Sequence, residues 1–304
     1  MIKIENVTKK LDDYVALSSL SCEIPKGSVF GLIGSNGAGK STLLRSITGI
    51  YRINEGAIWI DDELVYENPV AKERFVFVPD ELYFLPSANM NRMAKLYASV
   101  YKNFDRARFS ELTALFKLNP QENINKFSKG MKRQAAIILA LCTKADYLFF
   151  DETFDGLDPV KRNLVRNLIA QDAIDNGTTV IITSHSLREL EDTCDQLALL
   201  HEGGIVFESD VQNLKTSLFK VQIAFLEPYD ESKFDAFDTL NITKHGSVTN
   251  FIVRGEREET YESLSLFNPA LLEILPLSLE EVFIHEMANA GYSFDDILGG
   301  DDHV

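Results

Sequence analysis

The chain has 304 residues and a mass of 34.2 kDa, which suffices for one large domain together with a small one. A hydrophobic share of 45% excludes a mainly disordered chain, and a formal net charge of −16 argues against a nucleic-acid partner. The longest apolar run, Ala135 to Cys142, is far shorter than the ~20 residues of a membrane-spanning helix. Three cysteines without a Cys-x-x-Cys pair argue against a disulfide framework or a zinc site, so we expect a soluble cytoplasmic protein.

Short apolar runs alternate with helical patterns from the start of the chain to about Lys215. The runs are Ser28–Ile33, Phe75–Val78, Tyr147–Phe150 and Thr179–Thr183. Continuous apolar runs of this length are typical of parallel strands that are buried on both faces and joined by crossover helices. This part of the chain is therefore predicted to form an α/β domain, at residues 1–215, with a largely parallel sheet.

From Thr216 onward the charge and the pattern both change. Acidic side chains far outnumber basic ones here, so that most of the negative charge of the chain lies in this segment. Alternating segments at Lys220–Leu226 and Asn250–Arg254 predict strands, and an apolar–acidic pattern at Leu279–Met287 predicts a helix. We expect a small acidic α+β domain of accessory role at residues 216–304.

A glycine-rich segment follows the first apolar run. It reads GSNGAGKST and satisfies the pattern GxxxxGK[ST] between a strand-like and a helix-forming run. Such glycines let successive backbone N–H groups surround a polyphosphate, and the next helix adds its positive dipole end. The lysine is expected to reach the β- and γ-phosphates, and the serine hydroxyl to ligate Mg²⁺. The predicted nucleotide-binding residues are Gly34, Ser35, Asn36, Gly37, Ala38, Gly39, Lys40, Ser41 and Thr42.

Two carboxylates end the apolar run at Tyr147–Phe150. Asp151 and Glu152 follow this strand directly, at the edge of the sheet where the phosphate loop also lies. At that edge Asp151 is placed to hold Mg²⁺, and Glu152 to polarise an attacking water. Together with the phosphate loop, this strand end predicts a site that hydrolyses a nucleoside triphosphate.

Four further motifs resemble those of the ATP-binding-cassette (ABC) ATPases. The segment FSKGMKRQ, which holds Ser128 and Gly130, is similar to the LSGGQ signature and precedes the strand that ends in Asp151, as in that family. The segment Asp155–Pro159 is similar to the D-loop of the family. His185 matches its switch histidine, and Tyr14 matches the aromatic residue that stacks on adenine. The joint order and spacing of these motifs cover residues 1 to about 215.

The resemblance implies a fold and a location. The fold is a P-loop NTPase cassette with a RecA-like core, an antiparallel β subdomain and a helical subdomain at about 82–141. The resemblance further implies that an integral-membrane permease subunit is a partner, which places the cassette at the cytoplasmic face of the membrane.

The resemblance also assigns roles to residues. Two cassettes, as a homodimer or a heterodimer, enclose two ATP molecules between them. Lys40, Glu152 and His185 of one cassette are the implied catalytic residues. Ser128 and Gly130 of the other cassette are implied to bind the γ-phosphate, and hydrolysis then lets the pair open.

Two departures from the family pattern affect the site. Asp80, in FVFVPDE, stands where the family usually has a glutamine, and we count it with Ser41 and Asp151 as the predicted metal ligands. Lys129 and Met131 stand where glycine and glutamine are usual in the signature. An aspartate near the γ-phosphate leaves a regulatory subunit without hydrolysis open as an alternative.

The signature variant and the closing segment Pro276–Ile284 resemble bacterial exporter ATPases of the Ytr-like, drug and peptide-exporter groups. We therefore expect an Mg²⁺-dependent ATPase that drives export of peptides, drugs or small metabolites. A non-transport ATPase of DNA maintenance is the rival, and it usually carries coiled coils or zinc modules before its signature. Here the stretch from Lys40 to Ser128 is too short for such an insertion, and it contains no heptads or paired cysteines.

Overall fold

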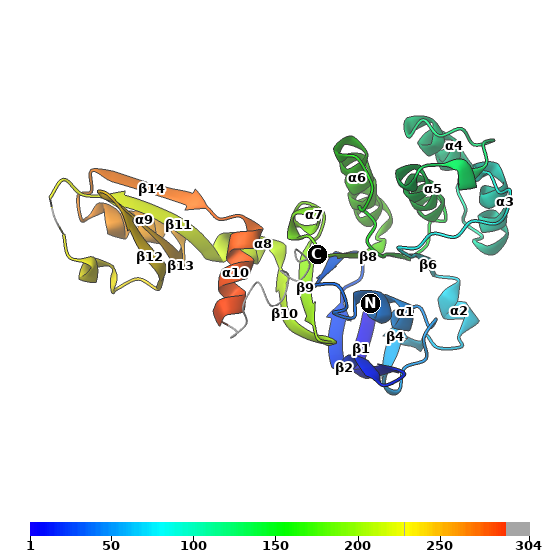
Figure 1. Ribbon diagram of the computed structural model, residues 1–304, viewed down its shortest axis with the longest axis horizontal. Coiled ribbons are helices and arrows are strands. Elements are labelled where there is room, and N and C mark those ends of the chain that lie inside the picture. Colours follow the sequence, from blue (N-terminus) through cyan, green and yellow to red (C-terminus); the bar gives the residue numbers. More distant parts are fainter. Residues whose placement is uncertain (228, 290–304) are drawn as a thin grey trace. The chain divides into compact units, whose positions relative to one another are not determined.

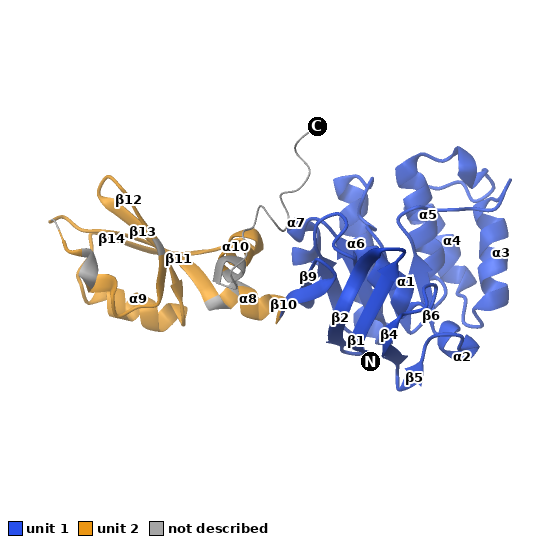
Figure 2. Cartoon of the chain, turned by 60° about the horizontal axis from the view of Figure 1, so that its bottom comes forward, with its two compact units in different colours: residues 1–208, 295–304 blue, residues 209–294 orange. Residues whose placement is uncertain are grey.

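The computed structural model describes residues 1–227 and 229–289. They divide into two compact units, of which the first holds residues 1–208 and the second begins at Ser209 (Figure 2). The boundary predicted at 215 falls a few residues later, inside helix α8 (Val211–Ser217) of the second unit. The change in charge along the sequence thus lies close to the structural division without coinciding with it.

A six-stranded sheet forms the centre of the first unit. Its strand order is β10-β9-β3-β8-β7-β6, and the five strands from β9 to β6 run parallel. All four predicted apolar runs are confirmed as strands of this sheet. The strands are β3 (Val29–Ile33), β6 (Phe75–Val78), β7 (Tyr147–Phe150), β8 (Thr179–Ser184), β9 (Gln196–His201) and β10 (Gly204–Asp210).

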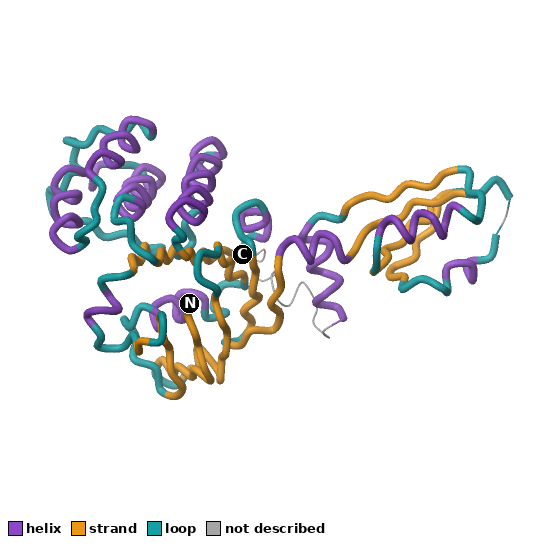
Figure 3. The backbone as a smooth tube through the Cα atoms, turned by 180° about the vertical axis from the view of Figure 1, so that it is seen from behind, coloured by secondary structure: helices purple, strands orange, loops and turns teal. Residues whose placement is uncertain are grey.

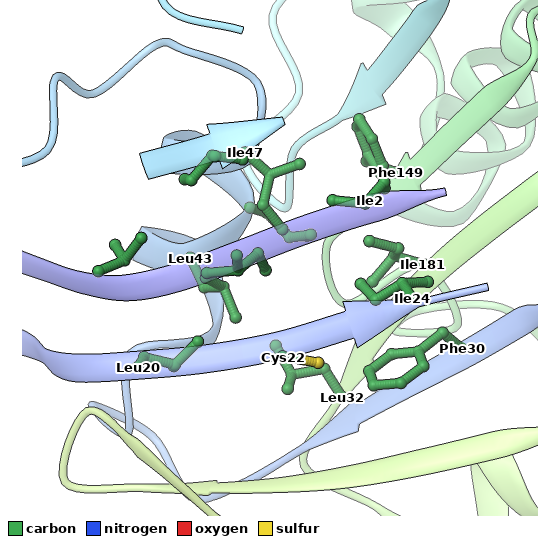
Figure 4. Close-up of a cluster of buried hydrophobic side chains, with 14 of the residues drawn as sticks. Ile2, Leu20, Cys22, Ile24, Phe30, Leu32, Leu43, Ile47, Phe149 and Ile181 are labelled. Carbon is green, nitrogen blue, oxygen red and sulfur yellow. The ribbon is translucent and has the colours of Figure 1, made fainter. Parts of the chain in front are cut away.

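A second, antiparallel sheet packs against one face of this centre. Its order is β2-β1-β4-β5, with bounds Ile2–Leu11 for β1, Tyr14–Ile24 for β2, Glu55–Ile60 for β4 and Glu63–Leu64 for β5. Leu43 and Ile47 of α1 (Lys40–Ile47) lie in one buried cluster with side chains of both sheets, such as Ile2 and Phe149 (Figure 4). Helix α1 is therefore fixed between the two sheets by apolar packing on both sides.

Helices gather on the other side of the central sheet (Figure 3). Between β6 and β7 lie α3 (Met90–Val100), α4 (Arg106–Leu115), the short η1 (Ile124–Lys126) and α5 (Lys129–Leu141). α6 (Pro159–Asn176) and α7 (Leu187–Glu191) follow β7 and β8 on this side. The short α2 (Pro69–Lys72) precedes β6 and lies on the side of the antiparallel sheet (Figure 1). Residues 133–141 of α5 are all buried, so this helix forms the middle of the helical layer.

The second unit is a four-stranded antiparallel sheet with helices. The strand order is β12-β13-β11-β14, with bounds Leu218–Ala224 for β11, Thr239–His245 for β12, Val248–Arg254 for β13 and Leu271–Pro276 for β14. Its helices are α8, η2 (Glu231–Phe234), α9 (Arg257–Ser265) and α10 (Leu279–Asn289). Alternate residues of β11 pack with Phe251 and Leu264 in a core of its own. The predicted strands and helix of a small α+β domain are confirmed.

Among the described residues, no helix combines the length and the apolar character needed to cross a membrane. The longest helix labelled in Figure 1 is α6, with 18 residues.

Candidate functional site

The phosphate loop connects β3 to α1, and its glycines are required by its shape. Gly37 and Gly39 have φ angles of 82° and 111°, in the left-handed region that favours glycine. At Gly34 a Cβ atom would lie 2.3 Å from the carbonyl oxygen of Leu200, closer than any real contact. The loop backbone can therefore follow this path only with glycine at these positions.

Lys40 lies inside the loop rather than in solvent. Its side chain is 6% exposed, and its Nζ donates to the carbonyl oxygens of Gly34 (2.6 Å) and Ser35 (3.1 Å). The same ammonium lies 3.5 Å from Oε1 of Glu152. The fold thus holds a buried positive charge within the loop that is predicted to bind a polyphosphate.

Asp151 at the end of β7 is held by two hydroxyls. Ser41 Oγ donates to its Oδ1 over 3.0 Å, and Thr183 Oγ1 donates to the same atom over 2.7 Å. Oδ2 of Asp151 is buried and has no hydrogen-bond partner. Sequence reasoning missed Thr183, although a hydroxyl residue at the end of an apolar strand, just before His185, was a signal that could have found it.

Glu152 and His185 are neighbours at the ends of β7 and β8. His185 Nδ1 lies 3.1 Å from Oε2 of Glu152, and the backbone N–H of Glu152 donates to Thr183 Oγ1 over 3.0 Å. Glu152 has a φ of 47°, which is uncommon for a residue other than glycine and is found preferentially at functional sites. The backbone is thus bent so that the carboxylate faces Lys40 and His185.

Lys40, Ser41 and Glu152 line a cavity of about 340 Å³, whereas Asp151 and His185 are not part of its lining. Tyr14 lies at its rim with 56% of its surface exposed, and its hydroxyl donates to the carbonyl oxygen of Gly37 over 3.3 Å. The structure brings together most of the predicted nucleotide site in this lining, which comprises Leu11, Tyr14, Ala16, Ser35, Asn36, Gly37, Gly39, Lys40, Ser41, Thr42, Asp80 and Glu152.

Asp80 also has a partner that the sequence did not suggest. Nη2 of Arg133, in α5, donates to Oδ1 of Asp80 over 2.6 Å, and Nη1 donates to the carbonyl oxygen of Pro79 over 2.9 Å. The Arg133 side chain is 1% exposed. Asp80 therefore connects the nucleotide cavity with the middle of the helical layer.

Ser128 and Gly130 lie at the start of α5, outside the cavity that Lys40 lines. Ser128 caps the helix, and its Oγ accepts a hydrogen bond from the backbone N–H of Met131 over 3.2 Å. Ser128 is exposed, so it is accessible to a ligand outside this cavity.

Comparison with known proteins decides the family. Residues 17–155 match the family model described as ABC transporter. The chain is 31% identical over 237 residues to the lantibiotic transport ATP-binding protein SrtF of Streptococcus pyogenes, which covers 74% of this chain and 98% of that protein. The chain belongs to the ATP-binding proteins of ABC transporters.

Two further similarities extend this assignment. The chain is 28% identical over 287 residues to the ABC transporter ATP-binding protein YtrB of Bacillus subtilis, which covers 93% of this chain and 97% of that protein. A dimeric ATP-binding cassette, solved in a post-hydrolysis state with ADP and Pi, has a TM-score of 0.63 at 21% identity over 69% of this chain and 99% of its own. The cassette fold predicted from the motifs is thereby confirmed.

Membership in the ABC family also settles the general function. The protein is an ATP-binding and ATP-hydrolysing subunit of an ABC transporter, as predicted. Subunits of this family work with transmembrane permeases and in pairs of cassettes. The alternative of a non-transport ATPase in regulation or DNA maintenance is excluded.

Proposed function

We propose that this ABC subunit hydrolyses ATP as its Mg²⁺ complex, and that it drives export of peptides, drugs or small metabolites from the cytoplasmic face of the membrane. The observation that carries the metal assignment is the buried, unpartnered Oδ2 of Asp151 beside the hydroxyl of Ser41. Carboxylate and hydroxyl oxygens are the ligands that Mg²⁺ prefers. The donor set at this strand end therefore fits the ion.

The residues in and beside the cavity have different roles in hydrolysis. Lys40 and the loop N–H groups bind the β- and γ-phosphates, and the Tyr14 ring stacks on adenine. Glu152 accepts a proton from the attacking water, while His185 holds the Glu152 carboxylate and contacts the γ-phosphate. Ser41 and Asp151, together with Asp80, would hold Mg²⁺, which when bound neutralises charge on the phosphates.

Pairing with a second cassette completes the site. Ser128 and Gly130 of the second cassette bind the γ-phosphate with a hydroxyl and with N–H groups of a helix start. Loss of the γ-phosphate removes these contacts, so that the pair opens and moves the permease.

The export assignment is supported by relatives that are themselves transport ATP-binding proteins, among them SrtF, whose name gives a lantibiotic as cargo. We place the acidic residues 216–304 on the side away from the membrane, as an accessory domain. The excess of acidic side chains in this segment would repel anionic lipid headgroups at close range.

The Asp151→Asn variant tests the metal assignment. We expect metal-free binding of a fluorescent ATP analogue to be retained, because Lys40 and the loop are untouched. Mg²⁺-stimulated hydrolysis should fall at least about 100-fold, since the amide is a neutral and weaker metal ligand. The control is Asp175→Asn, which removes an exposed carboxylate of α6. An Asp151→Asn protein with the Mg²⁺ dependence of the parent would contradict the assignment.

A further inference from the structure

The start of α5 packs directly on the D-loop of the same chain. We call Ser128–Met131 the signature turn; the D-loop is the segment Asp155–Pro159. A Cβ atom at Gly130 would lie 2.5 Å from the carbonyl oxygen of Gly156. Gly130 is therefore required by the close approach of two backbone segments, independently of any contact with a nucleotide.

The side chain of Lys129 covers the solvent side of this contact. Its methylene groups pass over Gly156, at 3.6 to 3.9 Å from the position of a Cβ there. Its Nζ lies 2.5 Å from Oδ2 of Asp155. Each partner stabilises the charged form of the other. The hydrogen bond to Asp155 is the main cause that raises the pKa of Lys129, and the hydrogen bond to Lys129 is the main cause that lowers the pKa of Asp155.

The lysine is a departure from the family pattern, which usually has a glycine at this position. A glycine could cover neither Gly156 nor Asp155. Because the side chains of Lys129 and Asp155 are 68% and 45% exposed, the pair adds little to the stability of the folded chain. The Lys129–Asp155 pair joins the signature turn to the D-loop, which indicates a role in the function of these two motifs.

We propose that Lys129 and Asp155 form a positioning pair, which holds the signature turn and the D-loop of one cassette as a single surface before a second copy of this chain closes on it. The inference rests on the proposed function, in which Ser128 faces the nucleotide of a second cassette. If the two segments are already ordered in the single cassette, no free energy is spent on ordering them when the two cassettes associate. The pair therefore strengthens ATP-dependent closure without touching the nucleotide.

The test is ATP-induced dimerisation in a Glu152→Gln background, measured by sedimentation. Lys129→Ala and Asp155→Asn should each raise the dimer dissociation constant about tenfold, because an exposed pair contributes about threefold and a symmetric dimer contains two. Exchange of the charges, Lys129→Asp with Asp155→Lys, should recover most of the loss. Lys126→Ala, at an exposed lysine of η1, is the matched control and should equal the parent.

Several results would overturn the inference. Tight dimers of Asp155→Asn beside weak dimers of Lys129→Ala would mean that the lysine acts on the nucleotide of the other copy. Single variants that dimerise like the parent, or a charge exchange as weak as the worse single variant, would also reject it. A Glu152→Gln parent that binds ATP and stays monomeric would reject pairing with a second copy of this chain, and this inference with it, whereas the proposed function fails only if the parent chain does not hydrolyse ATP.

Discussion

Asp80 contacts both the nucleotide cavity and the helical layer. Its carboxylate lines the nucleotide cavity and at the same time accepts a hydrogen bond from Arg133. A guanidinium that is 1% exposed requires a counter-charge, because an unpaired buried cation is strongly unfavourable. The aspartate at the position of the usual glutamine is thus explained by its pairing with Arg133, independently of a metal.

The Asp80→Asn variant separates these roles. It keeps the shape of the side chain and removes the charge that faces Arg133, so the free energy of unfolding should fall by about 1–2 kcal/mol. This is less than for a fully buried pair because Asp80 itself is 46% exposed. Urea denaturation measures the loss, and a parallel Mg²⁺ titration of hydrolysis should show a shifted metal requirement if the carboxylate is also a ligand.

The control for this variant is Glu81→Gln, which removes the next, exposed carboxylate. A stability of Asp80→Asn equal to that of the control would show that Arg133 does not depend on the acid. An unchanged Mg²⁺ requirement would remove Asp80 from the predicted metal ligands.

At the scale of elements, strands and strand ends were the most predictable features. The apolar runs at β3, β6, β7 and β8 are buried on both faces, and such runs can be recognised without knowledge of their neighbours. The positions of Lys40, Asp151 and Glu152 followed because carboxyl ends of parallel strands meet at one edge.

Contacts between elements that are distant in sequence were not predictable. Thr183 donates to Asp151 from the adjacent strand, and Arg133 reaches Asp80 from a different layer. The Arg133–Asp80 contact leaves no pattern in a single segment. The hydroxyl of Thr183 at a strand end is visible in the sequence, but its partner on the neighbouring strand is not. The close packing of Gly130 on Gly156 was not predictable either, because a glycine at this position is expected both for a close backbone contact and for a phosphate-binding turn.

The three cysteines offer a test of packing in three different parts of the first unit. Cys22 lies in β2, Cys142 follows α5, and Cys194 follows α7; all three are buried. Burial raises the pKa of each thiol, that of Cys142 to about 12. The thiolate is the reactive form, so a raised pKa leaves almost none of it at pH 8.

We therefore expect the native protein to react with Ellman's reagent far more slowly than a free thiol, while three thiols react at once in urea. The denatured sample is the control for reagent and concentration. A thiol that reacts in the native state at the rate of free cysteine would show that its element is packed less tightly than described.

At the scale of the whole molecule, the proposed catalytic residues all belong to one unit. The cavity, the signature turn and the D-loop all lie within residues 1–208, whereas the second unit has its own sheet and core. The charge pattern predicted two domains, but it did not mark the division at residue 208, which lies inside the strand β10.

The central claim is that this chain hydrolyses ATP with Glu152 as the residue that activates water. The most direct measurement is the turnover of Glu152→Gln at saturating Mg²⁺ and ATP, compared with the parent, together with ATP binding by the same samples. The amide keeps the shape and loses the basicity, so turnover should fall about 100- to 10,000-fold while binding is retained. Turnover within about twofold of the parent, with binding intact, would contradict the account.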